Sequence, residues 1–242
     1  MIGVIIPVHN EEAFLDNCLK AMRDAAHHPD LGGEPVVIVV VLDSCHDRSA
    51  DIAERHGVTS LIITAQNVGQ ARALGADYLI KAGARWLAFT DADTDVSPDW
   101  IVQQLLLDAD AVCGSIAVSD WQEHGEEVRA RFEAHYQDVE GHRHIHGANL
   151  GISRSAYLAT GGVPPIAVHE DVALVQALEA GGWRIAWSAA PRVVTSARQN
   201  ARAKGGFGSF LQTLQTQPCS ALAETHQVLT HKPSLGEIDR RA

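Results

Sequence analysis

Short apolar runs alternate with amphipathic stretches through the first half of the chain, and this alternation limits the fold more than any other feature. Four runs rich in β-branched residues predict strands at residues 2–8, 36–42, 60–64 and 86–90. The stretches that follow them predict helices near residues 11–26, 47–56, 69–82 and 98–107. Because the strands show almost no polar alternation, we expect a mostly parallel sheet with helices on both faces.

The second half continues this order and then departs from it. A fifth strand is expected over residues 110–118 and a long helix near residues 123–140. The remaining predicted elements are a strand and turn over 142–153, a helix over 169–182 that ends at two glycines, and strands over 183–188 and 192–196. The predicted fold class is therefore α/β, with one compact domain built from two fused halves.

Composition narrows the classes of partner. A chain of 242 residues that is 46% apolar can bury one large α/β core, and a formal net charge of −11 without a basic block argues against nucleic acid. No basic leader precedes the first strand, and the longest apolar run, residues 36–42, is far shorter than the roughly 20 residues that span a bilayer. We expect a cytoplasmic protein without a transmembrane segment, with peripheral attachment to the inner face of the membrane as an alternative.

The fourth predicted strand ends in FTDADTD, which places aspartates at positions 91, 93 and 95. Ligands of such sheets bind beyond the carboxyl ends of the strands, and crowded carboxylates repel one another unless a cation lies among them. Mg²⁺ and Mn²⁺ prefer oxygen ligands. Asp91 and Asp93 point to the same side of an extended chain, so Asp93 could bind the metal while Asp91 meets the nucleotide sugar or water. The alternative is a solvated turn that caps the helix beginning near Ser97.

The other strand ends carry further candidates. Glu11 follows the first strand, where a helix dipole would stabilise it without any ligand. Asp43 follows the second strand. After the third strand, Gly69 allows close backbone approach, and Arg72 offers a guanidinium for a phosphate. Each residue alone has an ordinary explanation, but their position at one edge of the predicted sheet favours a ligand site.

Six segments, in this order, resemble those of the family 2 glycosyltransferases of the GT-A fold, which is Rossmann-like: VIIPVHNEE, VVLDSCHDRSADIA, NVGQARALGADYLI, FTDADT, GANLGISRSAYLATGG and HEDVALVQALEAGGWRI. The resemblance implies a hexosyltransferase-like enzyme that depends on Mg²⁺ or Mn²⁺. It would move one sugar from a nucleoside diphosphate sugar to an acceptor hydroxyl, with inversion. A UDP-sugar is the favoured donor and a GDP-sugar the second choice, and the acceptor is not identified.

The resemblance also implies roles for individual residues. Asp171 would be the general base for the acceptor hydroxyl, with Glu170 orienting the acceptor, and Asp93 and Asp91 would bind the metal. The donor nucleotide would contact Pro7, His9, Glu11, Asp43, Asn67, Gly69, Arg72, Asp91 and Ala92. Residues 1–95 would form the nucleotide-sugar half, residues 96–198 the acceptor and catalytic half, and residues 199–242 a C-terminal lid or tail.

Candidate acceptor contacts lie in the second half. These are His146, Gly147, Asn149 and Trp121, the last of which is at least as well explained as a core tryptophan. Histidines occupy the alternate positions 142, 144 and 146, so a strand would place all three on one face, at a spacing that could bind a metal. A polar strand face is the commoner explanation of this pattern.

Two features after residue 196 remain open. Arg198, Arg202 and Lys204 precede two glycines. This pattern suits a lid that covers either the diphosphate or an anionic acceptor. The alternative is a solvated helix with a glycine break. Many members of the family have a histidine here that completes the metal site, whereas this chain has none between His169 and His226. Water, His226 or His231 would then supply the missing ligand.

Two other functions are weighed against sugar transfer. A sugar nucleotidyltransferase usually has a glycine-rich, basic loop after the first strand, and PVHNEE is neither. A non-catalytic nucleotide-sugar-binding protein would have no need of the segment HED at residues 169–171, which is intact here.

Overall fold

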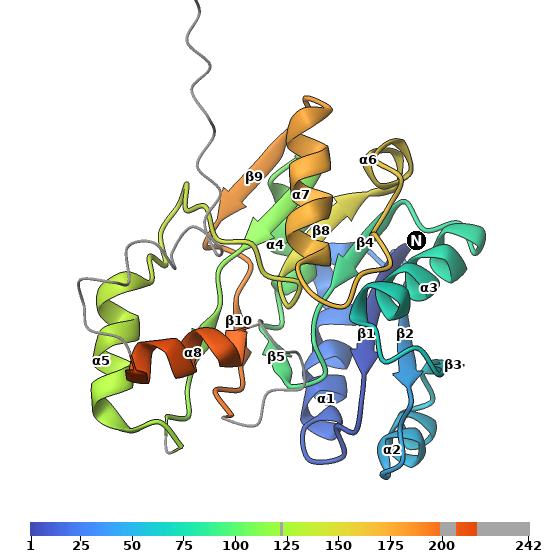
Figure 1. The fold of residues 1–242 in the computed structure, drawn as a ribbon. Coiled ribbons are helices and arrows are strands. Elements are labelled where there is room, and N and C mark those ends of the chain that lie inside the picture. The colour runs from blue at the N-terminus through green and yellow to red at the C-terminus, as the bar shows by residue number, and fades with distance from the viewer. Residues whose placement is uncertain (122, 199–206, 217–242) are drawn as a thin grey trace, which may run out of the picture.

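The computed structural model describes residues 1–121, 123–198 and 207–216. Its main sheet has seven strands in the order β3-β2-β1-β4-β8-β6-β9 (Figure 1). All neighbouring pairs are parallel except that β8 runs antiparallel to β4 and β6. The strands are β1 (Ile2–Val8), β2 (Val36–Asp43), β3 (Thr59–Ile63), β4 (Trp86–Phe89), β6 (Ala111–Gly114), β8 (Leu150–Ser153) and β9 (Ile185–Ser188). The predicted mostly parallel sheet is confirmed.

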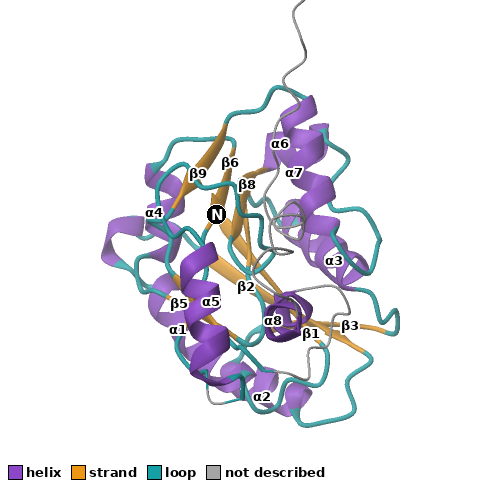
Figure 2. Ribbon diagram, turned by 60° about the vertical axis from the view of Figure 1, so that its left-hand side comes forward, coloured by secondary structure: helices purple, strands orange, loops and turns teal. Residues whose placement is uncertain are grey.

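Helices cover both faces of this sheet, as the continuous apolar strands require. Figure 2 shows α1 and α4 on one side of the strands and α3, α6 and α7 on the other. The helices are α1 (Leu15–Ala26), α2 (Ser49–His56), α3 (Val68–Lys81), α4 (Trp100–Leu106), α5 (Gly125–His135), α6 (Arg154–Ala159), α7 (Glu170–Ala180) and α8 (Phe207–Thr216), with a short 3₁₀ helix at Pro29–Leu31. None of the helices in these described ranges is long and apolar enough to cross a membrane.

A second, three-stranded sheet brings residues 193–196 to the acidic segment after β4. It consists of β5 (Thr94–Val96), β10 (Val193–Thr195) and β7 (Ala117–Val118), in the order β5-β10-β7. The N–H of Ser196 donates to the carbonyl of Asp93 over 3.1 Å, and the Thr94 hydroxyl donates to the Thr195 hydroxyl over 2.9 Å. The chain after β10 therefore passes directly beside Asp93.

Two predicted elements differ from the structure. The strand expected over residues 110–118 is two strands, β6 and β7, which belong to different sheets. The helix expected near residues 123–140 covers only Gly125–His135, because Tyr136 has an extended backbone (φ −85°, ψ 123°). This bend turns the Tyr136 ring into the core, where it stacks on Phe132 at 4.7 Å between ring centroids.

Candidate active site

Arg72 joins two of the predicted site residues. It lies in α3, and its side chain is only 5% exposed. One terminal nitrogen, Nη2, donates to Oδ1 of Asp91 over 2.5 Å, and Nη1 donates to the carboxylate of Glu170. Asp91 follows β4 and Glu170 begins α7, so one guanidinium connects the end of a central strand to the start of this helix.

Arg198 makes the equivalent connection for the second aspartate. Its Nη2 lies 2.6 Å from Oε1 of Glu11 and 3.0 Å from Oδ2 of Asp93, while Nη1 donates to the other Glu11 oxygen. The guanidinium also lies 5.1 Å from the centre of the Phe14 ring. Each aspartate of the Asp91–Asp93 pair is therefore bound to an arginine that also holds a glutamate.

This arrangement leaves negative charge at the sheet edge. The four carboxylates and two guanidiniums, if all are ionised, carry a net charge of −2. Burial raises the pKa of Asp93 to about 7; Arg198 opposes the rise, and the neighbouring charges of Asp91 and Glu11 add to it. Burial likewise raises the pKa of Glu170, against the attraction of Arg72. A divalent cation would neutralise the excess charge.

The donor set fits Mg²⁺ or Mn²⁺ only in part. Asp91 and Asp93 offer carboxylate oxygens, the ligand type that both ions prefer. Within the described ranges, however, no group of three or more acidic, histidine or cysteine side chains is spaced to hold a metal ion. Mg²⁺ commonly completes its shell with water and substrate phosphates, so a cation here would be held by one or two aspartates and a bound diphosphate.

Asp171, the predicted general base, lies beside this group. Its Oδ2 accepts the N–H of Gly147 over 2.7 Å, and its Oδ1 accepts the N–H of Val172 over 2.8 Å. A side chain at Gly147 would collide with the Arg72 guanidinium, so glycine is required for this close approach. The structure thus brings Arg72, Gly147, Glu170 and Asp171 together.

Asp43 holds the loop that precedes α3. Its carboxylate accepts the backbone N–H groups of Ala65, Gln66 and Asn67, each over 2.8 Å, and the Ser44 hydroxyl over 3.0 Å. Burial alone would raise the pKa of Asp43, but the hydrogen bonds outweigh it and lower the pKa. These bonds give Asp43 a clear role in the fold, and its contact with a nucleotide base stays a prediction.

The first turn of α3 is covered by the chain around residue 165. The N–H of Gly69 donates to the carbonyl of Ile166 over 3.2 Å, and the Asn67 amide donates to the carbonyl of Pro165 over 3.2 Å. A Cβ on Gly69 would collide with the carbonyl oxygens of Pro164 and Ile166. The close backbone approach predicted for Gly69 is therefore to this segment of the same chain, and donor contacts of Asn67 and Gly69 stay predictions.

The remaining predicted donor residues lie at the strand ends. His9 directly follows β1, and its Nδ1 hydrogen bonds to the carbonyl of Asp43 over 2.7 Å. Pro7 is within β1, in register with Val41 of β2. Ala92 is buried between the two aspartates, with 3% exposure.

Two predicted acceptor residues have interior partners. Asn149 is fully buried: its amide donates to the carbonyls of Ser115 and Pro191 and accepts the Trp100 indole N–H. Trp121 is half-buried and packs on Phe132 at 5.2 Å between ring centroids. These partners give both side chains a role in packing, and acceptor contacts of Asn149 and Trp121 stay predictions.

The histidine row is buried rather than strand-like. His142, His144 and His146 precede β8 in backbone that is irregular except for an isolated β-bridge at His144. Consecutive rings stack at 5.3 and 6.0 Å between centroids. The Tyr136 ring packs on His144 at 4.1 Å, and its hydroxyl lies 3.0 Å from Nε2 of His146. Burial holds the pKa of His146 well below its ordinary value. A row of buried, stacked rings is the arrangement of a packed interior, and the strand of this segment begins only at Leu150.

The structure describes only part of the predicted lid. Arg198 lies at the site, whereas Arg202, Lys204, His226 and His231 lie outside the described residues. The link between Glu11 and Arg198 was not predicted, because the two residues are 187 positions apart and were assigned to different halves. The only sequence signal for this ion pair was the basic residue Arg198, shortly after the last predicted strand.

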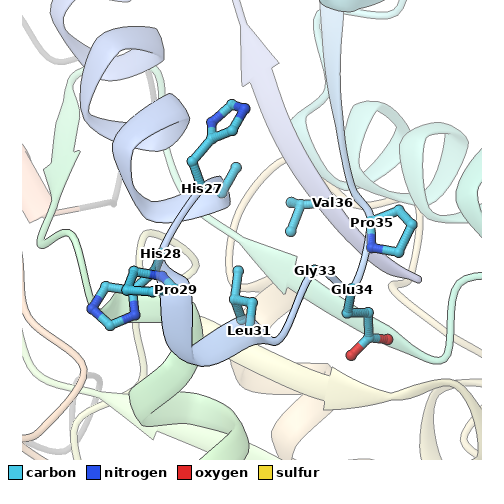
Figure 3. Close-up of a pocket in the computed structure, with 9 residues that line it drawn as sticks. His27, His28, Pro29, Leu31, Gly33, Glu34, Pro35 and Val36 are labelled. Carbon is cyan, nitrogen blue, oxygen red and sulfur yellow. The ribbon is translucent and has the colours of Figure 1, made fainter.

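A cavity of about 420 Å³ lies at the other end of the main sheet (Figure 3). It is lined by residues that follow α1 and by Glu34, Pro35 and Val36, which lead into the amino end of β2. None of the predicted site residues lines it. The site is therefore defined by the cluster of charged groups at the carboxyl edge.

Comparisons with solved structures support the fold. PcManGT, a mannosyltransferase from Pyrobaculum calidifontis in complex with GDP-Man and Mn²⁺, is 18% identical, with a TM-score of 0.61 over 83% of this chain and 58% of its own. S. aureus TarS with UDP-GlcNAc is 12% identical, with a TM-score of 0.62 over 94% and 70%. M. tuberculosis glucosyl-3-phosphoglycerate synthase with Mn²⁺, UDP and glucosyl-3-phosphoglycerate is 16% identical, with a TM-score of 0.54 over 93% and 79%.

Sequence comparison assigns the family. The chain spans only 61% of TarS in its UDP complex and 58% of PcManGT, and at these identities the likeness shows the fold alone. No curated protein sequence matches the chain. The model of glycosyl transferase family 2, however, matches residues 3–158, which is more than half of the chain. The chain therefore belongs to glycosyl transferase family 2.

Proposed function

We propose that this protein transfers one sugar from a nucleoside diphosphate sugar to an acceptor hydroxyl, with inversion and with Asp171 as the general base. The observation that carries the proposal is the position of the Asp171 carboxylate, which accepts the N–H of Gly147 next to the guanidinium that binds Asp91. Asp171 thus lies beside Arg72, the arginine that binds Asp91. Transfer from a diphosphate sugar needs both a base for the acceptor hydroxyl and a charged site for the diphosphate. Residues 1–95 would bind the donor and residues 96–198 the acceptor.

The departing diphosphate needs positive charge. As the anomeric carbon loses its bond to the diphosphate oxygen, the electron pair leaves with the nucleotide. Mg²⁺ or Mn²⁺, held by Asp93 and Asp91, would supply charge stabilisation for that group when bound. Arg72 is paired with Asp91 and Arg198 with Asp93, so two arginines add positive charge at this edge.

The acceptor hydroxyl needs a base. Hydrogen bonds from Gly147 and Val172 orient the Asp171 carboxylate, and Glu170 is held next to it by Arg72. In the proposed step the acceptor oxygen attacks the anomeric carbon from the face opposite the diphosphate, and its proton passes to Asp171. Attack from that face inverts the configuration.

The proposed donor rests on the family and on the ligands of similar solved structures. PcManGT is described with GDP-Man and Mn²⁺, TarS with UDP-GlcNAc, and the M. tuberculosis synthase with UDP and Mn²⁺. The ligands of these similar structures favour a UDP-sugar as the donor, with a GDP-sugar as the second choice. They also favour Mn²⁺ or Mg²⁺ as the cofactor. We propose the base contacts at Asp43 and His9, which lie together at the ends of β2 and β1.

Product analysis tests the proposal against a nucleotidyltransferase. The protein is incubated with UDP- and GDP-sugars, Mn²⁺ or Mg²⁺ and a mixture of hydroxyl acceptors, and released nucleoside diphosphate is measured. A parallel reaction contains nucleoside triphosphate and sugar 1-phosphate, with detection of pyrophosphate. The proposal expects nucleoside diphosphate and no pyrophosphate, whereas pyrophosphate release would contradict it.

A further inference from the structure

Arg198 lies between the Glu11 carboxylate and that of Asp93, one of the two aspartates that would hold the proposed metal. Its guanidinium contacts both oxygens of Glu11 and one oxygen of Asp93, and these three side chains are 6% to 16% exposed. The pairing of β10 with β5 fixes this position, since Ser196 is bonded to the backbone of Asp93 and the N–H of Arg198 donates to the Ser196 hydroxyl over 3.2 Å.

The other guanidinium does not compete for Asp93. Arg72 binds Asp91 and Glu170 instead. Among the described residues, Arg198 is the cation that contacts the Asp93 carboxylate. A divalent cation bound to the same oxygen would lie within a few ångströms of a guanidinium, and two like charges at that distance repel strongly in a partly buried site.

Arg198 is also incompletely satisfied in this position. Its Nε is buried with no hydrogen-bond partner in the described part of the chain. A buried donor without a partner costs free energy, which lowers the cost of moving the guanidinium away. A bound diphosphate would offer new acceptors to the same side chain.

We propose that Arg198 is a resident counterion that competes with the divalent cation for Asp93. The inference rests on the proposed metal role of Asp93. Metal binding then requires the guanidinium to leave Asp93, so the protein without nucleotide binds the metal weakly.

Titration of Mn²⁺ into the 242-residue protein without nucleotide tests this directly, with free Mn²⁺ followed by electron paramagnetic resonance. Arg198→Gln should bind Mn²⁺ about fivefold more tightly than wild type, or more, the lower end of typical site coupling. Arg48→Gln is the matched control, because Arg48 pairs with Glu12 at the same edge but is 77% exposed; its Mn²⁺ affinity should equal that of wild type.

A second variant keeps the test decisive if Arg198→Gln does not fold. Arg198→Lys keeps the charge but loses the planar fork that bridges two carboxylates, so its Mn²⁺ affinity should exceed that of wild type. Unchanged or weaker binding in a folded variant overturns the competition alone. Absence of Mn²⁺ binding in wild type and variants alike, also with a nucleoside diphosphate present, overturns both this inference and the proposed metal site.

Discussion

The Arg72 guanidinium and the Asp91 carboxylate form a hydrogen-bonded ion pair of 2.5 Å at the carboxyl edge of the main sheet. The arginine comes from a helix and the aspartate from the end of a strand, and the same guanidinium binds Glu170 at the start of α7. The side chains of Arg72 and Glu170 are each only 5% exposed. The pair of Arg72 and Glu170 is therefore part of the interior as well as of the site.

Arg72→Met should destabilise the protein by about 3–5 kcal/mol, because it leaves the buried Glu170 carboxylate without a partner. The free energy of unfolding is measured by urea denaturation. Adding Glu170→Gln to the same protein should recover part of the loss, since one uncompensated charge is then removed. The control is Arg85→Met, whose ion pair with Glu34 involves a 55% exposed arginine and should cost no more than about 1 kcal/mol. Equal losses in the two arginine variants would contradict the buried role of Arg72.

Asp43→Asn should lower stability by about 1–3 kcal/mol at neutral pH, because an amide cannot accept all the N–H groups that the carboxylate binds. The folded-state pKa of Asp43 is lowered relative to the unfolded chain. Its contribution is therefore present above the unfolded pKa of about 4 and is lost as the pH falls through the folded pKa.

Urea denaturation at several acidic pH values checks this sign. The stability difference between wild type and Asp43→Asn should shrink as the pH falls towards about 3. Asp51→Asn, an exposed residue in the first turn of α2, is the control and should leave the pH dependence unchanged. A difference that stays constant with pH would show that the Asp43 carboxylate is not the titrating group.

Gly69→Ala should destabilise the protein by about 1–3 kcal/mol, because the added methyl group meets fixed backbone oxygens of Pro164 and Ile166. Thermal unfolding measures the loss. Gln70→Ala, one residue further along the same helix and exposed, should stay close to wild type. A Gly69→Ala protein as stable as wild type would mean that the segment around residue 165 does not pack on α3 in this way.

Asp171→Asn should reduce the rate of sugar transfer by about 10²–10⁴-fold, the usual contribution of a general base. Donor binding should be unchanged, because no predicted donor contact is removed. Rates are measured by release of nucleoside diphosphate and donor affinity by calorimetry. Asp24→Asn, an exposed residue of α1, is the control for a loss of one carboxylate. Full activity in Asp171→Asn would remove the residue from the base role.

The sequence predicted the main sheet well because its signal is local. The apolar runs that form β1, β2 and β4 have no polar alternation, and that pattern fixes both strand conformation and burial on two faces. The position of the acidic residues at one edge of the sheet was predicted from the same pattern, because parallel strands have their carboxyl ends at one edge. The antiparallel direction of β8 was not predicted, because four residues carry no information about which neighbours they will pair with.

The charge pairs of the site could not be predicted from local patterns. Glu11 and Arg198 meet only because β10 pairs with β5, and neither short strand has a distinctive sequence. The histidine row shows the opposite error, in which a local pattern suggested a strand. Stacking of His144 on Tyr136 and burial of all three rings favoured an irregular path instead.

Nucleotide binding at the Asp93 edge is the central claim, and a thermal-shift measurement tests it most directly. Wild type is melted with UDP and GDP, each with Mn²⁺ and with chelator, beside Asp93→Ala and the control Asp95→Ala, which removes the exposed third aspartate. A ligand at about 100 times its dissociation constant should add about 2.7 kcal/mol. We predict stabilisation by one nucleotide that requires Mn²⁺, persists in Asp95→Ala and is lost in Asp93→Ala; stabilisation in none of these conditions would contradict the account.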